Sequence, residues 1–313
     1  MDKVTHINKQ GFLENDDHKI YWEDWGNPEA VPILFFHGGP GCGCDDRDKL
    51  FFDPKKHSVI FHDQRGSGKS TPFASTVKNT TQDLVNDAEN ILNILGIEKV
   101  YVIGRSWGSA LSLFYAISHP ERVLKLLIGG VFLARQSELD FVNDGRLQSF
   151  FPEEWKRFIS LVPFEHQKTG DSIMNYYAEK MRSSDLQEAQ KYADEWTLWE
   201  VTLCSINYDP EKLKKEIIGD KNSVAIAILE THYFMNKCFV PENYILNNID
   251  KIRHIPCKVV QGRFDMCTPP ISSYDLAKAY GNNLSLQWAN GGHMVSDPDV
   301  AKYVKEAVDE FLV

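Results

Sequence analysis

The sequence predicts an α/β fold in which a mainly parallel sheet, flanked by helices, is interrupted by one helical insertion. Short apolar runs alternate with helix-like segments over residues 31–129 and again over residues 257–313. Between them, from about 134 to 250, the chain is helix-like, aromatic and charged, with few β-branched runs. We therefore expect one α/β domain made of residues 1–133 and 251–313, carrying a helical cap domain of residues 134–250.

The expected elements follow from local patterns along the chain. Residues 4–25 are typical of an antiparallel strand pair with a turn at residues 14–17. Residues 80–95 form an amphipathic helical pattern, which Gly96 ends. The remaining expected strands are 31–36, 57–62, 100–103, 123–129, 257–262 and 284–288, and the remaining helices outside the insertion are near 107–114, near 270–280 and from about 298.

Composition excludes several classes of protein. The chain has 313 residues, which is enough for a large core, and a formal net charge of −10, which argues against general nucleic-acid binding. It has no apolar stretch of transmembrane length, and its first residues lack the apolar core of a signal peptide, so we expect a cytoplasmic protein. Its six cysteines form no C-x-x-C pair, so we expect reduced thiols and no metal site.

The first chemical motif is Gly104-Arg105-Ser106-Trp107-Gly108, a G-x-S-x-G sequence between an apolar run and a helix-like run. A strand–turn–helix context of this kind is typical of a nucleophile elbow. The glycines let the backbone pass where a Cβ would clash, which leaves the serine hydroxyl exposed at the tip of the turn. The motif predicts that Ser106 is a nucleophile.

A serine nucleophile needs a general base that is oriented by a carboxylate. Asp265 follows the expected strand at 257–262, and His293 follows the expected strand at 284–288. The chain order Ser, Asp, His and the position of each residue after a strand predict a Ser106–Asp265–His293 triad.

Acyl transfer also requires hydrogen-bond donors for the developing oxyanion. One donor is expected to be the backbone N–H that follows the nucleophile, at Trp107. The other should come from the loop after an early strand, where the chain reads His37-Gly38-Gly39-Pro40-Gly41. The N–H of Gly39 is the first candidate and that of Gly38 the second.

Together, these motifs resemble those of the proline iminopeptidases, serine peptidases of the α/β-hydrolase fold. The resemblance extends into the insertion, and the matching segments are 37–41, 63–70, 104–109, 151–155, 196–200, 230–234, 262–265 and 291–293. It implies an inserted helical cap, removal of an N-terminal proline from peptide substrates through an acyl-enzyme, and no metal or organic cofactor.

The resemblance also implies how the substrate is held. Glu200 and Glu230 would bind the free ammonium group of the peptide, since charge-assisted hydrogen bonds to a carboxylate suit that group. Arg135 matches a family arginine near the start of the cap, and it would either order these carboxylates or be a surface charge. The walls of the proline pocket would include Trp107, Phe141 and the aromatic group around Tyr233.

Two positions depart from the family pattern. Arg105 stands where the family usually has glycine, and a cation there could alter substrate preference. Val142 replaces an aromatic residue in the cap and changes one expected wall of the pocket.

Two other hypotheses fit the sequence. The same triad could serve a broader aminopeptidase, an amidase or an esterase. The chain could also be a catalytically silent binding protein that has kept the fold, although an intact triad and oxyanion loop argue against this. The sequence does not predict an oligomeric state.

Overall fold

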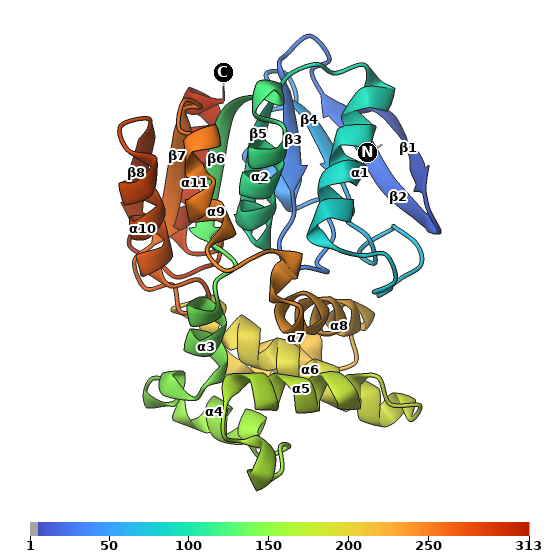
Figure 1. Ribbon diagram of the computed structural model, residues 1–313, viewed down its shortest axis with the longest axis vertical. Helices are drawn as coiled ribbons and strands as arrows, with labels where there is room; N and C mark the ends of the chain where they lie inside the picture. The colour runs from blue at the N-terminus through green and yellow to red at the C-terminus, as the bar shows by residue number, and fades with distance from the viewer. Residues whose placement is uncertain (1–5, 313) are drawn as a thin grey trace.

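The computed structural model of the protein describes residues 6–312 and contains one eight-stranded sheet (Figure 1). The strands lie in the order β1-β2-β4-β3-β5-β6-β7-β8. β1 pairs with β2 and β2 with β4 in antiparallel fashion, and every other pair is parallel, which confirms the expected mainly parallel sheet. Residues 4 and 5 of the expected first strand lie outside the described residues. The strands are β1 (Ile7–Asn15), β2 (His18–Gly26), β3 (Pro32–Phe36), β4 (Ser58–His62), β5 (Val100–Ser106), β6 (Val123–Val131), β7 (Cys257–Gly262) and β8 (Leu284–Ala289).

Helices cover both faces of the sheet, which explains why its central strands are almost continuously apolar. Successive side chains of a strand point to opposite faces, so Leu34 and Val102 pack into one core and Ile33 and Ile103 into another. The first core is covered by α1 (Thr81–Leu95), α2 (Trp107–Ser118) and α10 (Pro270–Tyr280). The second is covered by α11 (Pro298–Phe311).

The helix α1 shows how closely the local pattern determines an element. The Thr80 side chain accepts a hydrogen bond from the backbone N–H of Asp83, and the Asp83 side chain accepts one from the backbone of Thr80, which forms a capping box. Gly96 ends the helix in the left-handed conformation, with φ 69°. Both ends agree with the sequence prediction.

The insertion forms a layer of helices at one end of the sheet (Figure 1). A separate hydrophobic cluster, which includes Trp155, Phe158 and Trp196, holds these helices together. They are α3 (Gln136–Asn143), α4 (Pro152–Ile159), α5 (Gly170–Met181), α6 (Leu186–Cys204), α7 (Pro210–Ile217) and α8 (Lys221–Met235).

The chain returns to the main core before residue 250. Tyr233, Cys238 and Ile245 pack in the same cluster as the strands and α2, and α9 (Tyr244–Asn247) lies within this segment. The division at residues 133/134 and 250/251 remains a prediction, and this packing favours a return near the end of α8. No helix within residues 6–312 is both long enough and apolar enough to cross a membrane.

Candidate active site

Ser106 lies at the sharp turn between β5 and α2, with backbone angles φ 57° and ψ −130°. This conformation is unfavourable for a residue with a side chain, and such strain is found mainly where function requires it. Two close approaches hold the turn. A Cβ on Gly104 would lie 2.1 Å from the carbonyl oxygen of Gly108, and a Cβ on Gly108 would lie 2.2 Å from the carbonyl oxygen of Phe36. Only glycine fits at either position, so the motif spacing is a direct consequence of the turn.

Asp265 and His293 meet at the carboxyl end of the sheet, in the loops that follow β7 and β8. Nδ1 of His293 lies 2.8 Å from Oδ2 of Asp265, and both side chains are buried. The carboxylate also accepts hydrogen bonds from the N–H groups of Cys267 and Thr268, at 3.0 and 2.7 Å, and from Nε2 of Gln261, at 3.0 Å. These donors fix the orientation of the carboxylate and, through it, the imidazole ring.

Thr268 is a supporting residue that the sequence analysis did not single out. Its hydroxyl lies 2.9 Å from Oδ2 of Asp265 and 3.1 Å from Nδ1 of His293, so it bridges the two groups. Its position three residues after Asp265 is a local signal, but a threonine in a loop has too many ordinary uses for that signal to be specific.

Arg105 supports the histidine loop from behind. Its Nη2 donates a hydrogen bond of 2.9 Å to the carbonyl oxygen of His293, and its Nη1 is buried with no hydrogen-bond partner among the described residues. Burial lowers the pKa of the guanidinium to about 10. Arg105 is absent from the residues that line the pocket over Ser106, so its position does not favour the expected influence on substrate preference.

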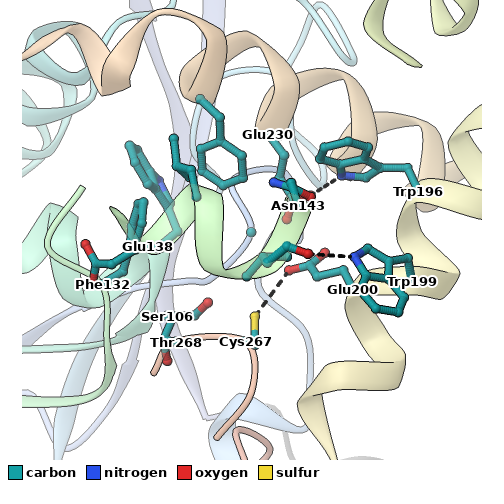
Figure 2. A pocket seen from close by; sticks show the side chains of 15 residues that line it. Ser106, Phe132, Glu138, Asn143, Trp196, Trp199, Glu200, Glu230, Cys267 and Thr268 are labelled. Atoms are coloured by element: carbon teal, nitrogen blue, oxygen red, sulfur yellow. Dashed lines mark hydrogen bonds between the residues drawn. The ribbon is translucent and has the colours of Figure 1, made fainter. Parts of the chain in front are cut away.

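A pocket opens over Ser106 and extends between the sheet and the cap (Figure 2). The predicted nucleophile Ser106 lies in this pocket with the two predicted ammonium-binding residues, Glu200 and Glu230. Two of the predicted oxyanion residues, Trp107 and Gly39, line it as well. The lining residues are Gly39, Ser106, Trp107, Phe132, Glu138, Leu139, Val142, Asn143, Trp196, Trp199, Glu200, Glu230, Phe234, Cys267 and Thr268.

The predicted oxyanion donors lie beside the nucleophile. Trp107 is the first residue of α2, so its N–H is one of the unpaired donors at a helix N-terminus. Gly39 has φ 105°, and a Cβ there would lie 2.6 Å from the backbone nitrogen of Gly41. A Cβ on Gly38 would lie 3.5 Å from Cβ of Ser106, so this loop passes directly against the elbow.

Glu200 of α6, which is half-buried, and Glu230 of α8, which is buried, form an acidic pair in the pocket (Figure 2). Oε2 of Glu230 accepts a hydrogen bond of 2.6 Å from Nε1 of Trp196, whereas Oε1 is buried and receives none from the described residues. Burial and repulsion by Glu200 raise the pKa of Glu230 well above its usual range, and burial raises the pKa of Glu200. The pair therefore leaves one buried carboxyl oxygen, Oε1 of Glu230, without a donor among the described residues.

Three predicted substrate-binding residues lie elsewhere. Arg135 is not placed to order the acidic pair, because its Nη1 forms an ion pair of 2.8 Å with Asp275 on α10. Tyr233 supports the pocket from outside: its ring packs 4.7 Å from that of Trp107, and its hydroxyl bonds to Asn79. Phe141 packs against the hydrophobic cluster of the cap.

Of the expected apolar walls, Trp107 lines the pocket and Phe141 does not. Phe132, Leu139 and Phe234 line the pocket together with Trp107, and Val142 occupies the position where the family pattern has an aromatic side chain. The sequence indicated that part of the wall would come from Phe141 and Val142, which lie on α3. It could not distinguish the side of α3 that faces the pocket from the side that faces the cap cluster.

Glu138 is a further buried carboxylate in the lining that sequence reasoning missed. It accepts hydrogen bonds from the backbone N–H groups of Leu133 and Arg135, at 3.1 and 3.0 Å, and from the hydroxyl of Ser272. Burial raises its pKa. Its oxygens are already occupied by the start of α3, so it serves the structure of the cap rather than binding.

Comparisons with known proteins agree with this geometry. The family model described as alpha/beta hydrolase fold matches residues 31–299. A proline iminopeptidase of Neisseria gonorrhoeae is 40% identical over 305 residues, which cover 96% of this chain and 96% of that protein. One of Arabidopsis thaliana is 40% identical over 288 residues, covering 92% of this chain and 75% of that protein.

Among solved structures, an esterase of Exiguobacterium antarcticum has a TM-score of 0.67 at 17% identity and covers 97% of this chain and 99% of its own. The Cif epoxide hydrolase of Acinetobacter nosocomialis also has a TM-score of 0.67, at 15% identity, with 98% of this chain and 90% of its own covered. At these identities the likeness concerns the fold alone.

The sheet, the elbow and the cap therefore define an α/β-hydrolase, and the chain is an enzyme of that class. Within the class, identities of 40% over nearly the whole chain decide the group. The chain belongs to the proline iminopeptidase family.

Proposed function

We propose that this protein is a serine peptidase that hydrolyses the amide bond after an N-terminal proline of peptides. The observation that carries the proposal is the acidic pair, Glu200 and Glu230, in the same pocket as Ser106. An esterase or a general amidase has no use for two carboxyls beside its acyl site, whereas an aminopeptidase must recognise an ammonium group one residue from the bond that it cuts.

In the proposed reaction, Ser106 Oγ attacks the carbonyl carbon of the substrate's first residue. His293 accepts the hydroxyl proton at Nε2, since Nδ1 is held by Asp265 at 2.8 Å. Asp265 keeps the imidazole in that tautomer and stabilises the imidazolium that forms. Thr268 and Gln261 position Asp265 through their hydrogen bonds to Oδ2.

The tetrahedral intermediate carries its negative charge on the former carbonyl oxygen. The N–H of Trp107, at the positive end of α2, and the N–H of Gly39 would donate hydrogen bonds to it. His293 then protonates the departing amine, so the C–N bond breaks and an acyl-enzyme remains. Water, activated by His293, attacks the ester carbon and releases the free amino acid and Ser106.

The acidic pair would select the substrate by charge. In the free enzyme, burial raises the pKa of both groups, and repulsion by Glu200 raises that of Glu230 further, so uptake of a proton by the pair is favoured. The ammonium group of an N-terminal proline supplies positive charge and two N–H donors, because the ring nitrogen is a secondary amine. Oε1 of Glu230, which lacks a donor, is the atom best placed to receive one. A peptide with a blocked N-terminus, or an internal segment of a chain, has no ammonium group to pair with the carboxyls. Its binding would leave these groups shielded from water without a partner, which costs free energy.

The apolar wall of Trp107, Phe132 and Leu139 suits a pyrrolidine ring, which has no hydrogen-bond donors beyond the amine. A broader aminopeptidase that accepts other small N-terminal residues is the second candidate, because Val142 leaves that wall smaller than the family pattern. The partner in either case is a peptide with a free N-terminus. The cytoplasmic location remains a prediction.

A substrate panel tests the proposal. Amides of proline, alanine and leucine, an N-acetylprolyl amide and a simple ester are compared by kcat/KM, with labelling by a serine-reactive fluorophosphonate as a check of the nucleophile. We expect the prolyl amide to be hydrolysed fastest and the acetylated one not at all. Equal rates for prolyl and acetylprolyl amides, or no labelling of Ser106, would contradict it.

A further inference from the structure

Two cysteines stand beside the proposed general base, in an arrangement that the described function does not use. Cys204 is the last residue of α6, and Cys267 lies in the loop after β7, two residues beyond Asp265. The sulfur atoms of both cysteines and a ring nitrogen of His293 all lie within 4.8 Å of one another. The three residues come from three separate elements, so only the fold brings them together.

We propose that Cys204, Cys267 and His293 form a site for a thiophilic divalent cation such as Zn²⁺, and that the bound ion inhibits the enzyme. Two thiolates and one imidazole are the donor set that Zn²⁺ prefers, with a fourth position left open. Zn–S bonds of about 2.3 Å and Zn–N bonds of about 2.0 Å place tetrahedral ligand atoms roughly 3.5–3.8 Å apart. The present separations therefore need to close by about 1 Å, which small side-chain rotations can supply.

The backbone around the site is already ordered. The carbonyl oxygen of Cys204 accepts hydrogen bonds from the N–H groups of His293 and Met294, at 2.7 and 2.9 Å, which ties the end of α6 to the histidine loop. On the other side, the N–H of Cys267 donates to Asp265 at 3.0 Å. The backbone of all three ligands is therefore fixed by hydrogen bonds to or from Asp265 or the His293 loop. Ion binding would not require a loop to change its conformation.

His293 has the carboxylate partner that is usual for a metal-binding histidine, namely Asp265. Nδ1 of His293 is held by Asp265, so Nε2 is the nitrogen available to an ion, and the carboxylate orients the ring from behind. Carboxylate–histidine–metal arrangements of this kind are the rule at zinc sites. Coordination would occupy the same Nε2 that accepts the proton of Ser106, which is why binding should inhibit.

The pocket gives the ion both access and a favourable charge. Cys204 is buried, but Cys267 lines the pocket over Ser106 and is half-buried. Its sulfur lies 4.0 Å from Oε1 of Glu200 (Figure 2), so an acidic side chain of the pocket stands beside the site. Binding of one Zn²⁺ would release the two thiol protons to solvent. The ion and the substrate's ammonium group would compete for the same acidic space.

Cobalt binding tests the site without reference to activity. The whole enzyme, treated with a chelator and kept in a phosphine reductant, is titrated with Co²⁺. We expect a thiolate-to-cobalt charge-transfer band that saturates at one ion per chain. The band should be absent from Cys204→Ala and present in Cys257→Ala, a matched change at a buried cysteine of β7. Absence of the band in the unmodified enzyme would overturn the metal site.

Inhibition by buffered Zn²⁺ tests the consequence. We expect competitive inhibition of prolyl amide hydrolysis, reversed by chelator, and a rise of at least about tenfold in the inhibition constant for Cys204→Ala, with Cys257→Ala like the unmodified enzyme. The inhibition rests on the proposed role of His293 as general base, whereas ion binding does not. A cobalt band without loss of activity would therefore contradict that role and leave the site in place. Equal inhibition of Cys204→Ala and Cys257→Ala would overturn the site as the cause of inhibition.

Discussion

The two halves of the active site are built by different physical means. On the sheet side, Ser106, Asp265 and His293 each follow a strand, and parallel strands bring their carboxyl ends to one edge. On the cap side, Glu200 and Glu230 sit within helices α6 and α8, whose relative position depends on how aromatic side chains pack. The sheet side supplies a chemistry shared by many hydrolases. The cap side is the part that we propose selects a charged N-terminus. The two sides should therefore respond differently to mutation.

Removal of the nucleophile should have the largest effect. In Ser106→Ala the acyl-enzyme cannot form, and comparable losses in a serine protease reach about 10⁶-fold in kcat. The loss should be equally severe for a prolyl amide and for a simple ester, since both need the sheet side. Steady-state rates and circular dichroism on the same samples check this. A folded variant that still cleaves either substrate at more than a hundredth of the original rate would contradict the assignment.

The pH dependence should separate the two sides more finely. The acidic pair has a raised pKa, so it becomes neutral as the pH falls while the pH is still above the ordinary glutamate range of about 4.3. The useful quantity is kcat/KM for prolyl amide divided by that for the cyclopentanecarbonyl amide, which has a similar ring but no amine. We expect this ratio to fall on the acid side as the pair takes up protons, and above about pH 8 as the amine loses its own.

Titration of the triad changes kcat/KM for both substrates by the same factor, so it does not change the ratio. A ratio that stays constant from acid to alkaline pH would show that the carboxyls do not recognise the charge of the substrate.

Loss of the bridging hydroxyl should have an intermediate effect on the sheet side. In Thr268→Val the shape is kept, but Asp265 loses a hydrogen bond of 2.9 Å, so the imidazole is held less well. One hydrogen bond to a charged group corresponds to about a tenfold loss in kcat. Thr202→Val is a matched control, because the Thr202 hydroxyl bonds only to the carbonyl of Leu198 within α6. Equal activity of the two variants would contradict a role of the Thr268 hydroxyl in positioning Asp265.

Arg105 should have the smallest effect and no influence on specificity. Its guanidinium holds the carbonyl oxygen of His293 and does not line the pocket. Arg105→Met should therefore lower kcat a few-fold by the same factor for prolyl, alanyl and leucyl amides. Arg253→Met, at an exposed ion pair with Asp250, serves as the control. A changed order of preference among the three amides would restore the interpretation of Arg105 as a specificity residue.

The same contrast explains how much the sequence could predict. Strand runs, the G-x-S-x-G spacing and the capping signals of α1 are local patterns, and the fold followed from them almost element by element. The contact between Asp265 and His293 was predictable because each residue follows a strand, while their catalytic roles stay a prediction. The wall at Trp107 was also predictable, but the one at Phe141 was not, because Phe141 and Val142 are adjacent and only the orientation of α3 decides which of them faces the pocket.

The ion-pair partners of charged residues could not be predicted from the sequence either. Arg135 pairs with Asp275, 140 residues along the chain, and nothing local indicates this contact. Likewise, Cys204 and Cys267 carry no metal-binding spacing, and only the fold places them beside His293. The expectation of no metal site rested on spacing along the chain, and spacing does not reveal a cluster assembled from three separate elements.

The most direct test of the central claim is a change of one carboxyl measured on two substrates. In Glu230→Gln the bond from Trp196 can be kept through the amide oxygen, but the negative charge is gone. We expect kcat/KM to fall about 10- to 100-fold for the prolyl amide, because a charge-assisted bond is lost, and to change less than about threefold for the cyclopentanecarbonyl amide. An equal loss on both substrates would show that Glu230 supports the fold of the site and does not recognise the N-terminus.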